Sequence, residues 1–357
     1  MENAKKIPLL CIVGPTASGK TGLSIALAKE LKGEIISADS MQIYKGMPIA
    51  SAAPTKEEKG DTPHHLFEFL EPDTAFSVAD YVNLAHKTIY EVYSRGKLPI
   101  LVGGTGLYVN SVVDNIQFTE EPFDDTLRKK LEAEMDAIGA EEMLKKLAEF
   151  DKETAEKLHA NNRRRIIRAF EVYYQTGKTI TEQNALSKQI PSPYDTIMLG
   201  MTYRDREKLY ERINLRVDKM LENGLLEEAK QSVALVGRGA GQAIGHKELL
   251  PYISGECSLD FAVENLKRET RRYAKRQLTW FNRDERINWL YVDECDVLSE
   301  AKKIVSRADK KRRSYYNYYT NREWGEMSNY DLPLNLSSIA EDKAVDLVID
   351  FLESLNK

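Results

Sequence analysis

The alternation of apolar runs and helical patterns along the first third of the chain predicts strands and helices in turn. Residues 7–13 form a continuous apolar run, and residues 23–31 then carry apolar side chains at helical spacing. Two further short apolar runs, at 34–37 and 98–102, are typical of a parallel sheet that is covered on both faces. Because an amphipathic helical pattern at 78–93 separates them, we expect a doubly wound α/β core.

The pattern changes beyond residue 124, where strand candidates give way to helical periodicity. Residues 125–190 are rich in Lys, Glu and Arg, and Gly139 and Gly177 stand where helices are expected to end. Strand character returns at 196–201 and 287–292, which indicates an inserted all-helical subdomain within the sheet core. The predicted regions are the first part of the core (1–124), the helical insertion (125–190), the return to the core (191–305) and a C-terminal extension without an assigned role (306–357), with one last helix at 339–355.

The overall composition is that of an ordinary soluble protein. Its 357 residues are 42% apolar, and the apolar run near the N-terminus, of about seven residues, is too short for a membrane helix. Three widely spaced cysteines without a C-x-x-C pair argue against a disulfide framework and a zinc ribbon. We therefore expect a cytoplasmic protein without a membrane partner, and its 30% of charged residues is compatible with a monomer.

Charge is distributed unevenly along the chain. The net charge of −5 argues against a general polyanion-binding protein, yet residues 161–168 (N-N-R-R-R-I-I-R) and 267–276 (K-R-E-T-R-R-Y-A-K-R) are strongly basic. A single cluster would be explained by a solvated helix face with i,i+4 ion pairs. Two clusters in one acidic chain also fit an acidic partner such as a nucleic acid.

The strongest chemical signal is the segment G-P-T-A-S-G-K-T, which lies between a predicted strand and a predicted helix. It matches the P-loop pattern G-x-x-x-x-G-K-[ST], so the expected fold is a P-loop NTPase-like parallel sheet core flanked by helices. Backbone N–H groups of such a loop bind phosphate oxygens, Lys20 adds a cation, and the Thr21 hydroxyl is suited to Mg²⁺. The predicted residues for binding a nucleotide or another chained phosphate are Gly14, Pro15, Thr16, Ala17, Ser18, Gly19, Lys20 and Thr21.

Two further segments follow predicted strands and are expected near the P-loop, because ligands of open α/β sheets bind at the carboxyl ends of the strands. Asp39 ends the second apolar run. It would hold Mg²⁺ in a kinase or ATPase, accept a proton from an amine in a transferase, or only cap a helix. Thr105, within G-G-T-G after the third run, would contact a phosphate oxygen or belong to a simple tight turn.

Seven segments in order along residues 9–290 resemble the bacterial tRNA dimethylallyltransferases, the tRNA isopentenyltransferases of the IPP transferase family. The segments are G-P-T-A-S-G-K-T, S-A-D-S-M-Q-I-Y-K-G-M, P-H-H-L, L-V-G-G-T-G-L-Y, R-A-F-E-V-Y-Y-Q-T-G-K, Q-A-I-G-H-K-E and Y-A-K-R-Q-L-T-W-F. The helical insertion and the last two segments resemble the branch that acts on tRNA. Plant-type enzymes that prenylate free adenine nucleotides share only the first segments.

This resemblance implies a reaction. A dimethylallyl group would pass from dimethylallyl diphosphate to N6 of adenine 37 in the anticodon loop of tRNAs that read UNN codons, with Mg²⁺ as cofactor. The products would be N6-(dimethylallyl)adenosine and diphosphate, and no nucleotide would be hydrolysed. By the same resemblance Asp39 is the general base, Thr105 and Lys20 lie at the reacting centre, and Arg212 and Arg216 reach the diphosphate.

The resemblance also implies which residues contact the tRNA. The adenine would be extruded from its stack and held by Asp39, Ser40, Met41, Gln42 and Thr105. The anticodon stem-loop would be bound by basic residues of the insertion and by a second surface further along the chain. These residues are Arg128, Arg164, Arg165, Arg168, Gln242, Gly245, His246, Lys247 and Arg272.

Three positions depart from the pattern of that family. Ala53 stands where a lysine is usual, Asn162 ends the segment that is usually H-P-N-D, and His246 stands where a tyrosine is usual. The P-loop, the aspartate and the threonine are present, so the transfer chemistry is still expected. Two other functions stay open from the residues alone: a P-loop kinase or ATPase, and a non-catalytic RNA-binding protein whose P-loop is only a structural turn.

Overall fold

The computed structural model describes residues 6–118, 125–232, 241 and 243–320. The chain forms two compact units, Met1–Leu298 and Ser299–Lys357. The helix expected at 339–355 lies outside the described residues, as does most of the predicted extension. Among the residues that are described, no helix is long and apolar enough to cross a membrane.

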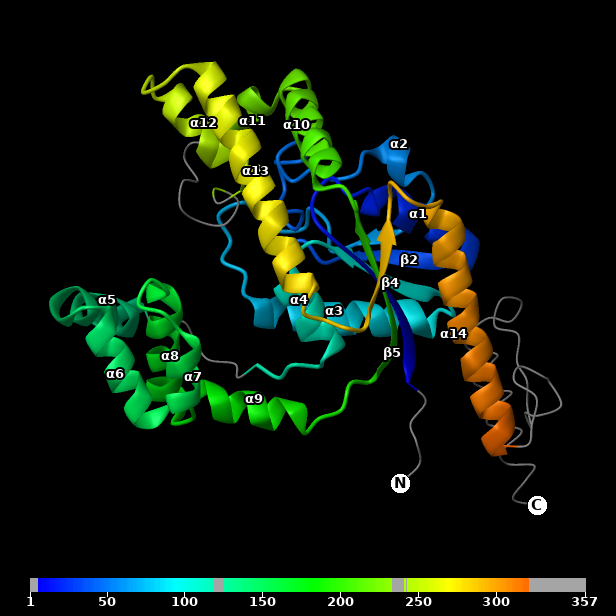
Figure 1. The fold of residues 1–357 in the computed structure, drawn as a ribbon, viewed down its shortest axis with the longest axis horizontal. Helices are drawn as coiled ribbons and strands as arrows, with labels where there is room; N and C mark the ends of the chain where they lie inside the picture. The colour runs from blue at the N-terminus through cyan, green and yellow to red at the C-terminus, as the bar shows by residue number, and fades with distance from the viewer. Residues whose placement is uncertain (1–5, 119–124, 233–240, 242, 321–357) are drawn as a thin grey trace. The chain divides into compact units, whose positions relative to one another are not determined.

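The first unit is built on a six-stranded parallel sheet with the order β3-β2-β4-β1-β5-β6, which confirms the predicted α/β fold (Figure 1). Five of the strands match the apolar runs of the sequence. The sixth, β3, has only two residues and therefore carries no periodicity that a sequence pattern could show. The strands are β1 (Ile7–Val13), β2 (Gly33–Ser37), β3 (His64–His65), β4 (Leu98–Gly103), β5 (Tyr194–Thr202) and β6 (Ile287–Tyr291).

Helices cover the sheet because its strands are apolar on both sides. In β1 the side chains of Leu9, Cys11 and Val13 belong to a buried cluster with α3 (Val78–Ser94) and α4 (Gly106–Val113). The alternate residues of the strand point to the opposite face, where α1 (Lys20–Leu31) contacts β1, β2 and β4. A short helix, α2 (Lys56–Lys59), follows β2. This packing leaves the carboxyl ends of the strands as the edge where their loops meet.

The insertion is all-helical, as predicted, and has a core of its own. Leu131, Met135, Met143, Leu147 and Phe170 are among the side chains buried in it. Both glycines expected at helix ends lie there with positive φ, of 87° at the start of α6 and 69° at the end of α8. The helices are α5 (Asp125–Ile138), α6 (Ala140–Phe150), α7 (Lys152–Lys157), α8 (Arg163–Thr176) and α9 (Ile180–Lys188).

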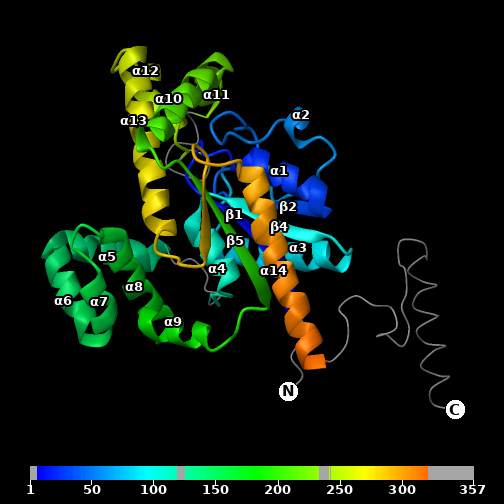
Figure 2. The same cartoon turned by 45° about the vertical axis from the view of Figure 1, so that its right-hand side comes forward.

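After β5 the chain forms a group of helices close to the ends of the strands. Figures 1 and 2 both show α10 and α13 side by side, and the two helices contact each other. A separate apolar cluster that includes Val217, Leu225, Leu249 and Leu266 holds this group together. The helices are α10 (Arg206–Glu222), α11 (Leu225–Gln231), α12 (His246–Ile253) and α13 (Leu259–Phe281), and α14 (Val297–Thr320) follows β6.

Candidate active site

The P-loop connects β1 to α1, as its sequence predicts. Gly14 has φ 143°, and a Cβ at this position would lie 2.3 Å from the carbonyl oxygen of Met201 on β5, so only glycine fits. Lys20 begins α1, and its Nζ donates a hydrogen bond of 2.7 Å to the carbonyl oxygen of Pro15. The loop therefore closes on itself next to the N-terminus of a helix, the geometry that binds phosphate.

Two cations occupy this region, and both are half-buried. Burial lowers the pKa of Lys20 from 10.5 to about 7, with a further lowering by the charge of Arg216 from α10. Burial also lowers the pKa of the Arg216 guanidinium. Asp39 acts in the opposite direction on both groups. Arg212, one turn earlier on α10, is exposed, and its Nε donates to the carbonyl oxygen of Ala17 at 3.4 Å.

Asp39 lies two residues after the end of β2, and a turn rather than a helix follows it, so the helix-cap interpretation is wrong. Its Oδ1 accepts hydrogen bonds from the backbone N–H groups of Met41, at 2.9 Å, and Gln42, at 3.4 Å. Within the described part of the chain Oδ2 has no hydrogen-bond partner. The carboxylate is thus oriented through one oxygen, and the other is available to a ligand.

Thr105 connects the loop after β4 to the loop after β2. Its Oγ1 accepts from the backbone N–H of Ser40 at 3.0 Å and donates to the Ser40 hydroxyl at 3.3 Å, and its own N–H donates to the Ala38 carbonyl oxygen at 3.2 Å. The G-G-T-G segment leads directly into α4, for which Thr105 is the N-terminal boundary residue. The segment is therefore more than a turn, because it holds the aspartate loop in place.

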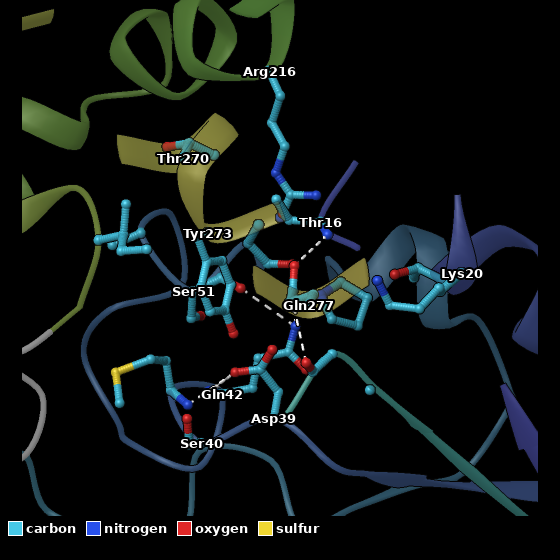
Figure 3. Close-up of a pocket in the computed structure, with 18 of the residues that line it drawn as sticks. Thr16, Lys20, Asp39, Ser40, Gln42, Ser51, Arg216, Thr270, Tyr273 and Gln277 are labelled. Carbon is cyan, nitrogen blue, oxygen red and sulfur yellow. Dashed lines mark hydrogen bonds between the residues drawn. The ribbon is translucent and has the colours of Figure 1, made fainter. Parts of the chain in front are cut away.

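The three loops surround a cavity of about 340 Å³. Figure 3 shows its polar side, where Thr16, Lys20, Asp39 and Arg216 lie around the same space. The lining also includes the apolar side chains of Phe67, Val217, Met220, Ile244 and Leu266, of which the last four belong to one apolar cluster. A pocket lined by both charged and apolar side chains suits a ligand that joins an anionic group to an apolar one.

Four of the five residues predicted to hold the adenine line this cavity, and the fifth, Thr105, lies behind them, bonded to Ser40. Ser40, Met41 and Gln42 all belong to it. The Gln42 amide donates to the carbonyl oxygens of Ser51 and Ala52, at 3.3 and 3.4 Å, and its oxygen accepts from the Ser37 hydroxyl at 3.1 Å. The structure therefore brings the predicted phosphate, base and adenine residues to one place.

The basic residues of the insertion lie on α5 and α8, away from these loops in sequence. Arg164, Arg165 and Arg168 are exposed. Arg168 and Arg128 both pair with the buried carboxylate of Glu171, each at 3.5 Å. Arg164 and Arg165 form no ion pair with any residue that the structure describes. Asn162, one of the unusual positions, accepts a hydrogen bond of 2.9 Å from the His159 N–H and precedes α8.

The residues of the second predicted tRNA surface differ in their exposure. Gln242 lies outside the described residues. Gly245 is buried with φ 119°, whereas Lys247 is exposed and lines the cavity. Arg272, on α13, is exposed and pairs with Glu269 at 2.6 Å.

The side chain of His246, which the resemblance assigns to the tRNA surface, is buried and only 2% exposed. Its Nε2 lies 2.9 Å from Glu228 of α11, and that carboxylate also accepts from the N–H groups of Ile49 and Ala50, at 2.8 and 2.9 Å. The unusual histidine therefore anchors the loop that also contains Ala53. An RNA contact by this side chain would require that the network open.

Sequence reasoning did not single out Glu228, Tyr273 or Gln277. Gln277 accepts from the Thr16 N–H at 2.8 Å and donates to the Gly104 carbonyl oxygen at 2.9 Å. Tyr273 lines the cavity next to Gln277 on the same helix. The available signal was the segment Y-A-K-R-Q-L-T-W-F, in which tyrosine and glutamine, four residues apart, lie on one helix face.

A magnesium ion fits the oxygen donors of this cavity. Thr21 lines it next to Lys20, and its hydroxyl is a hard donor of the kind that Mg²⁺ prefers. Among the described residues no group of three or more His, Cys, Asp or Glu is arranged to hold a metal. Mg²⁺ is commonly bound through one or two protein ligands, with phosphate oxygens and waters as the others, so this donor set is sufficient for a shared site.

Known relatives match both the sequence and the fold. The family model described as IPP transferase matches residues 42–284. A tRNA dimethylallyltransferase of Acetivibrio thermocellus is 52% identical over 81% of this chain and 93% of its own length, and one of Bacillus velezensis is 50% identical over 85% and 97%.

Solved structures give the same result. The tRNA isopentenylpyrophosphate transferase of Bacillus halodurans superposes with a TM-score of 0.62 at 43% identity, covering 86% of this chain and 96% of that one. A eukaryotic dimethylallyltransferase that acts on tRNA has a TM-score of 0.70 at 29% identity, with 90% and 81% covered. The resemblance seen in the sequence is thus confirmed, and the chain belongs to the IPP transferase family.

Proposed function

We propose that this protein transfers the dimethylallyl group of dimethylallyl diphosphate to N6 of adenine 37 in tRNAs that read UNN codons. One observation carries the proposal: Lys20 and Arg216 are desolvated cations in the same cavity, and Asp39 is the only carboxylate among its described lining residues. Two such cations beside one carboxylate favour a polyanionic group such as a diphosphate. The relatives are tRNA dimethylallyltransferases, which supports a dimethylallyl donor and a tRNA acceptor.

The reaction needs a base for the adenine amine. In it, N6 attacks the allylic C1 of the donor, the C1–O bond breaks, and the diphosphate leaves with the bonding electrons. Because the amine is nearly non-basic, it loses its proton as the N–C bond forms, and Asp39 accepts this proton through Oδ2. The N–H groups of Met41 and Gln42 hold Oδ1, so the carboxylate is oriented before the substrate binds.

The leaving diphosphate needs stabilisation of its developing charge. Backbone N–H groups of the P-loop and the charges of Lys20 and Arg216 supply it. Thr21 is the residue that would hold Mg²⁺, which adds positive charge against the diphosphate when bound. The apolar side chains that line the cavity suit the five-carbon group, and this match supports a prenyl donor over a nucleotide.

The tRNA would approach through exposed basic side chains. Arg164, Arg165 and Lys247 are exposed, and Lys247 also lines the cavity. Such cations position an RNA backbone without reading its bases, while the adenine is extruded into the pocket.

We also propose a cytoplasmic enzyme that acts as a monomer, since one chain supplies every group that this mechanism uses. Light scattering of the purified protein tests the monomeric state.

The direct test is a transfer assay. Purified protein is mixed with Mg²⁺, dimethylallyl diphosphate and an unmodified tRNA with the sequence A36-A37-A38, and the nucleosides are analysed by mass spectrometry. We expect an adenosine that is heavier by one C5H8 unit at position 37, and no phosphate release from ATP. Phosphate release from ATP without this product would favour a P-loop ATPase, and RNA binding without either would favour a binding protein.

A further inference from the structure

Helix α13 touches the active-site loops through one buried side chain. Gln277 is 6% exposed and forms two hydrogen bonds with backbone groups of different loops. Its Oε1 accepts from the N–H of Thr16 in the P-loop at 2.8 Å, and its Nε2 donates to the carbonyl oxygen of Gly104 after β4 at 2.9 Å. In Figure 3 the side chain lies between Thr16 and Asp39, and both bonds are drawn. A single amide thus joins the phosphate loop to the threonine loop.

The connection continues to the aspartate. Thr105 follows Gly104 directly and is bonded to Ser40, which is the residue after Asp39. Tyr273, one turn before Gln277 on the same helix, also lines the cavity. The loops after β1, β2 and β4 are therefore linked in series, and α13 supplies the link between the first and the last.

The fit around Gln277 is tight. A Cβ at Gly104 would lie 2.2 Å from Nε2 of Gln277, so the glycine allows the amide to approach the backbone this closely. Gly104 does not have a positive φ, so its conformation alone does not require glycine. The sterically demanding feature is the contact itself, which indicates that the distance between the two loops is set by the length of this side chain.

We propose that Gln277 is a positioning residue for prenyl transfer, which fixes the P-loop relative to Thr105 and Asp39. This inference rests on the proposed function. The diphosphate is held by the P-loop, and the amine and its base by the other two loops, so their separation determines the attack distance on C1. A displacement on the order of 1 Å costs about 100-fold in rate in enzymes that rely on such positioning.

Two substitutions at this position separate the bonds. Gln277→Met has a similar length and removes both hydrogen bonds. Gln277→Glu keeps an acceptor for the Thr16 N–H, but its ionised form cannot donate to the Gly104 carbonyl oxygen. When protonated, the glutamic acid regains a donor. A positioning role therefore predicts that the kcat ratio of Gln277→Glu to the wild type rises as the pH falls from 8 to 6, which a loss of stability would not produce.

The matched control uses another contact of the same helix. The Trp280 Nε1–H donates to Asn110 Oδ1 at 3.0 Å, and Asn110 Nδ2 donates to Asp284 at 3.3 Å, so Asn110→Ala removes two hydrogen bonds of α4, neither of which involves the three loops. We expect this variant to lower the melting temperature and to keep kcat within about twofold. Gln277→Met is expected to lower kcat by about 10- to 100-fold with both substrates saturating, with the tRNA Kd unchanged within about twofold. Circular dichroism verifies that each variant is folded.

The results test the positioning role of Gln277 separately from the proposed prenyl-transfer function. If the wild type forms product but Gln277→Met keeps kcat within twofold, or loses no more than Asn110→Ala, the positioning role is overturned. If the wild type forms no product, the proposed function fails, and the role of Gln277 is then tested by calorimetry with inorganic diphosphate and Mg²⁺. In that experiment, an affinity of Gln277→Met for diphosphate about 3- to 10-fold weaker than that of the wild type supports the role in holding the P-loop. An unchanged affinity overturns it.

Discussion

The cavity at the sheet edge and the helical insertion both carry cations, but under opposite conditions. In the cavity, Lys20 and Arg216 are desolvated, and burial lowers the pKa of each. In the insertion, the four arginines of α8 are exposed, and two of them form ion pairs with described residues, Arg163 with Asp136 and Arg168 with Glu171. The free-energy cost of keeping a side chain positively charged is thus high in the cavity and close to zero in the insertion.

The difference shows how each region would bind an anion. Exposed pairs are screened by water and salt, and each contributes between about 0 and 1 kcal/mol, so an RNA phosphate gains little by replacing a carboxylate there. When an anion binds to a desolvated cation that lacks sufficient counter-charge, the favourable electrostatic energy is much larger than for an exposed pair. We therefore expect the cavity to determine the chemistry and the insertion to determine only placement, and the following predictions test that division.

The largest effect is expected at Asp39. Asp39→Asn keeps the size of the side chain and an acceptor for the Met41 N–H, but it removes the base. We expect kcat to fall by about 10²- to 10⁴-fold, the usual contribution of a general base, while the Kd for tRNA changes little. Single-turnover kinetics with saturating tRNA measures the loss. Near-normal kcat in this variant would show that the proton leaves by another route.

Asp39 also illustrates what the sequence could provide. The strand before it, the P-loop and the G-G-T-G segment are local patterns, and the parallel topology then brings their ends to one edge, so this part of the site was predictable. Gln277 and Glu228 were not. Their roles depend on which helix face meets which loop, and helical periodicity reports that a face is buried but not what it contacts. The burial of His246 against Glu228 was not predictable for the same reason.

A smaller loss is expected when one buried cation is removed. Lys20→Met keeps most of the apolar stem and deletes the charge that faces the diphosphate. We expect kcat/KM for dimethylallyl diphosphate to fall by about 10²- to 10³-fold, as for the loss of one preorganised donor to a developing negative charge. Arg212→Met is the comparison variant, because the resemblance assigns both cations to the diphosphate but Arg212 is exposed, with a 3.4 Å hydrogen bond to the Ala17 carbonyl oxygen and a ring contact with Tyr203. An equal loss in both variants would remove the distinction between buried and exposed cations.

The lowered pKa of Lys20 predicts a pH dependence of diphosphate binding. In the empty pocket burial and Arg216 reduce this pKa to about 7, and a bound anion favours the charged form and raises it again. Affinity that depends on the ammonium is therefore fully present below pH 7 and is lost as the pH rises, by about tenfold at pH 8. Calorimetry with diphosphate and Mg²⁺ from pH 6 to 8 measures this change.

The ligand titrates as well, so the comparison needs a variant whose cation does not lose its proton. Lys20→Arg serves this purpose, because a guanidinium stays protonated throughout the range. The affinity of the wild type relative to Lys20→Arg should decline from pH 6 to 8, and binding by the wild type should take up more protons at pH 8. A constant ratio would mean that Lys20 is already charged in the empty pocket.

The smallest effect is expected for substitutions in the insertion. There, the salt dependence of tRNA binding should differ between arginines with and without an ion pair. Arg165 is exposed and has no ion pair with a described residue, whereas Arg163 on the same helix pairs with Asp136. If Arg165 contacts an RNA phosphate, Arg165→Ala weakens tRNA binding by several-fold at low salt and lowers the slope of log K against log salt by about one, since one fewer counterion is released. Arg163→Ala should change that slope much less, because its guanidinium is already neutralised by a carboxylate. Equal slopes in the wild type and in Arg165→Ala would make the basic segment of α8 a solvated helix face and move the tRNA surface towards Lys247 and α13.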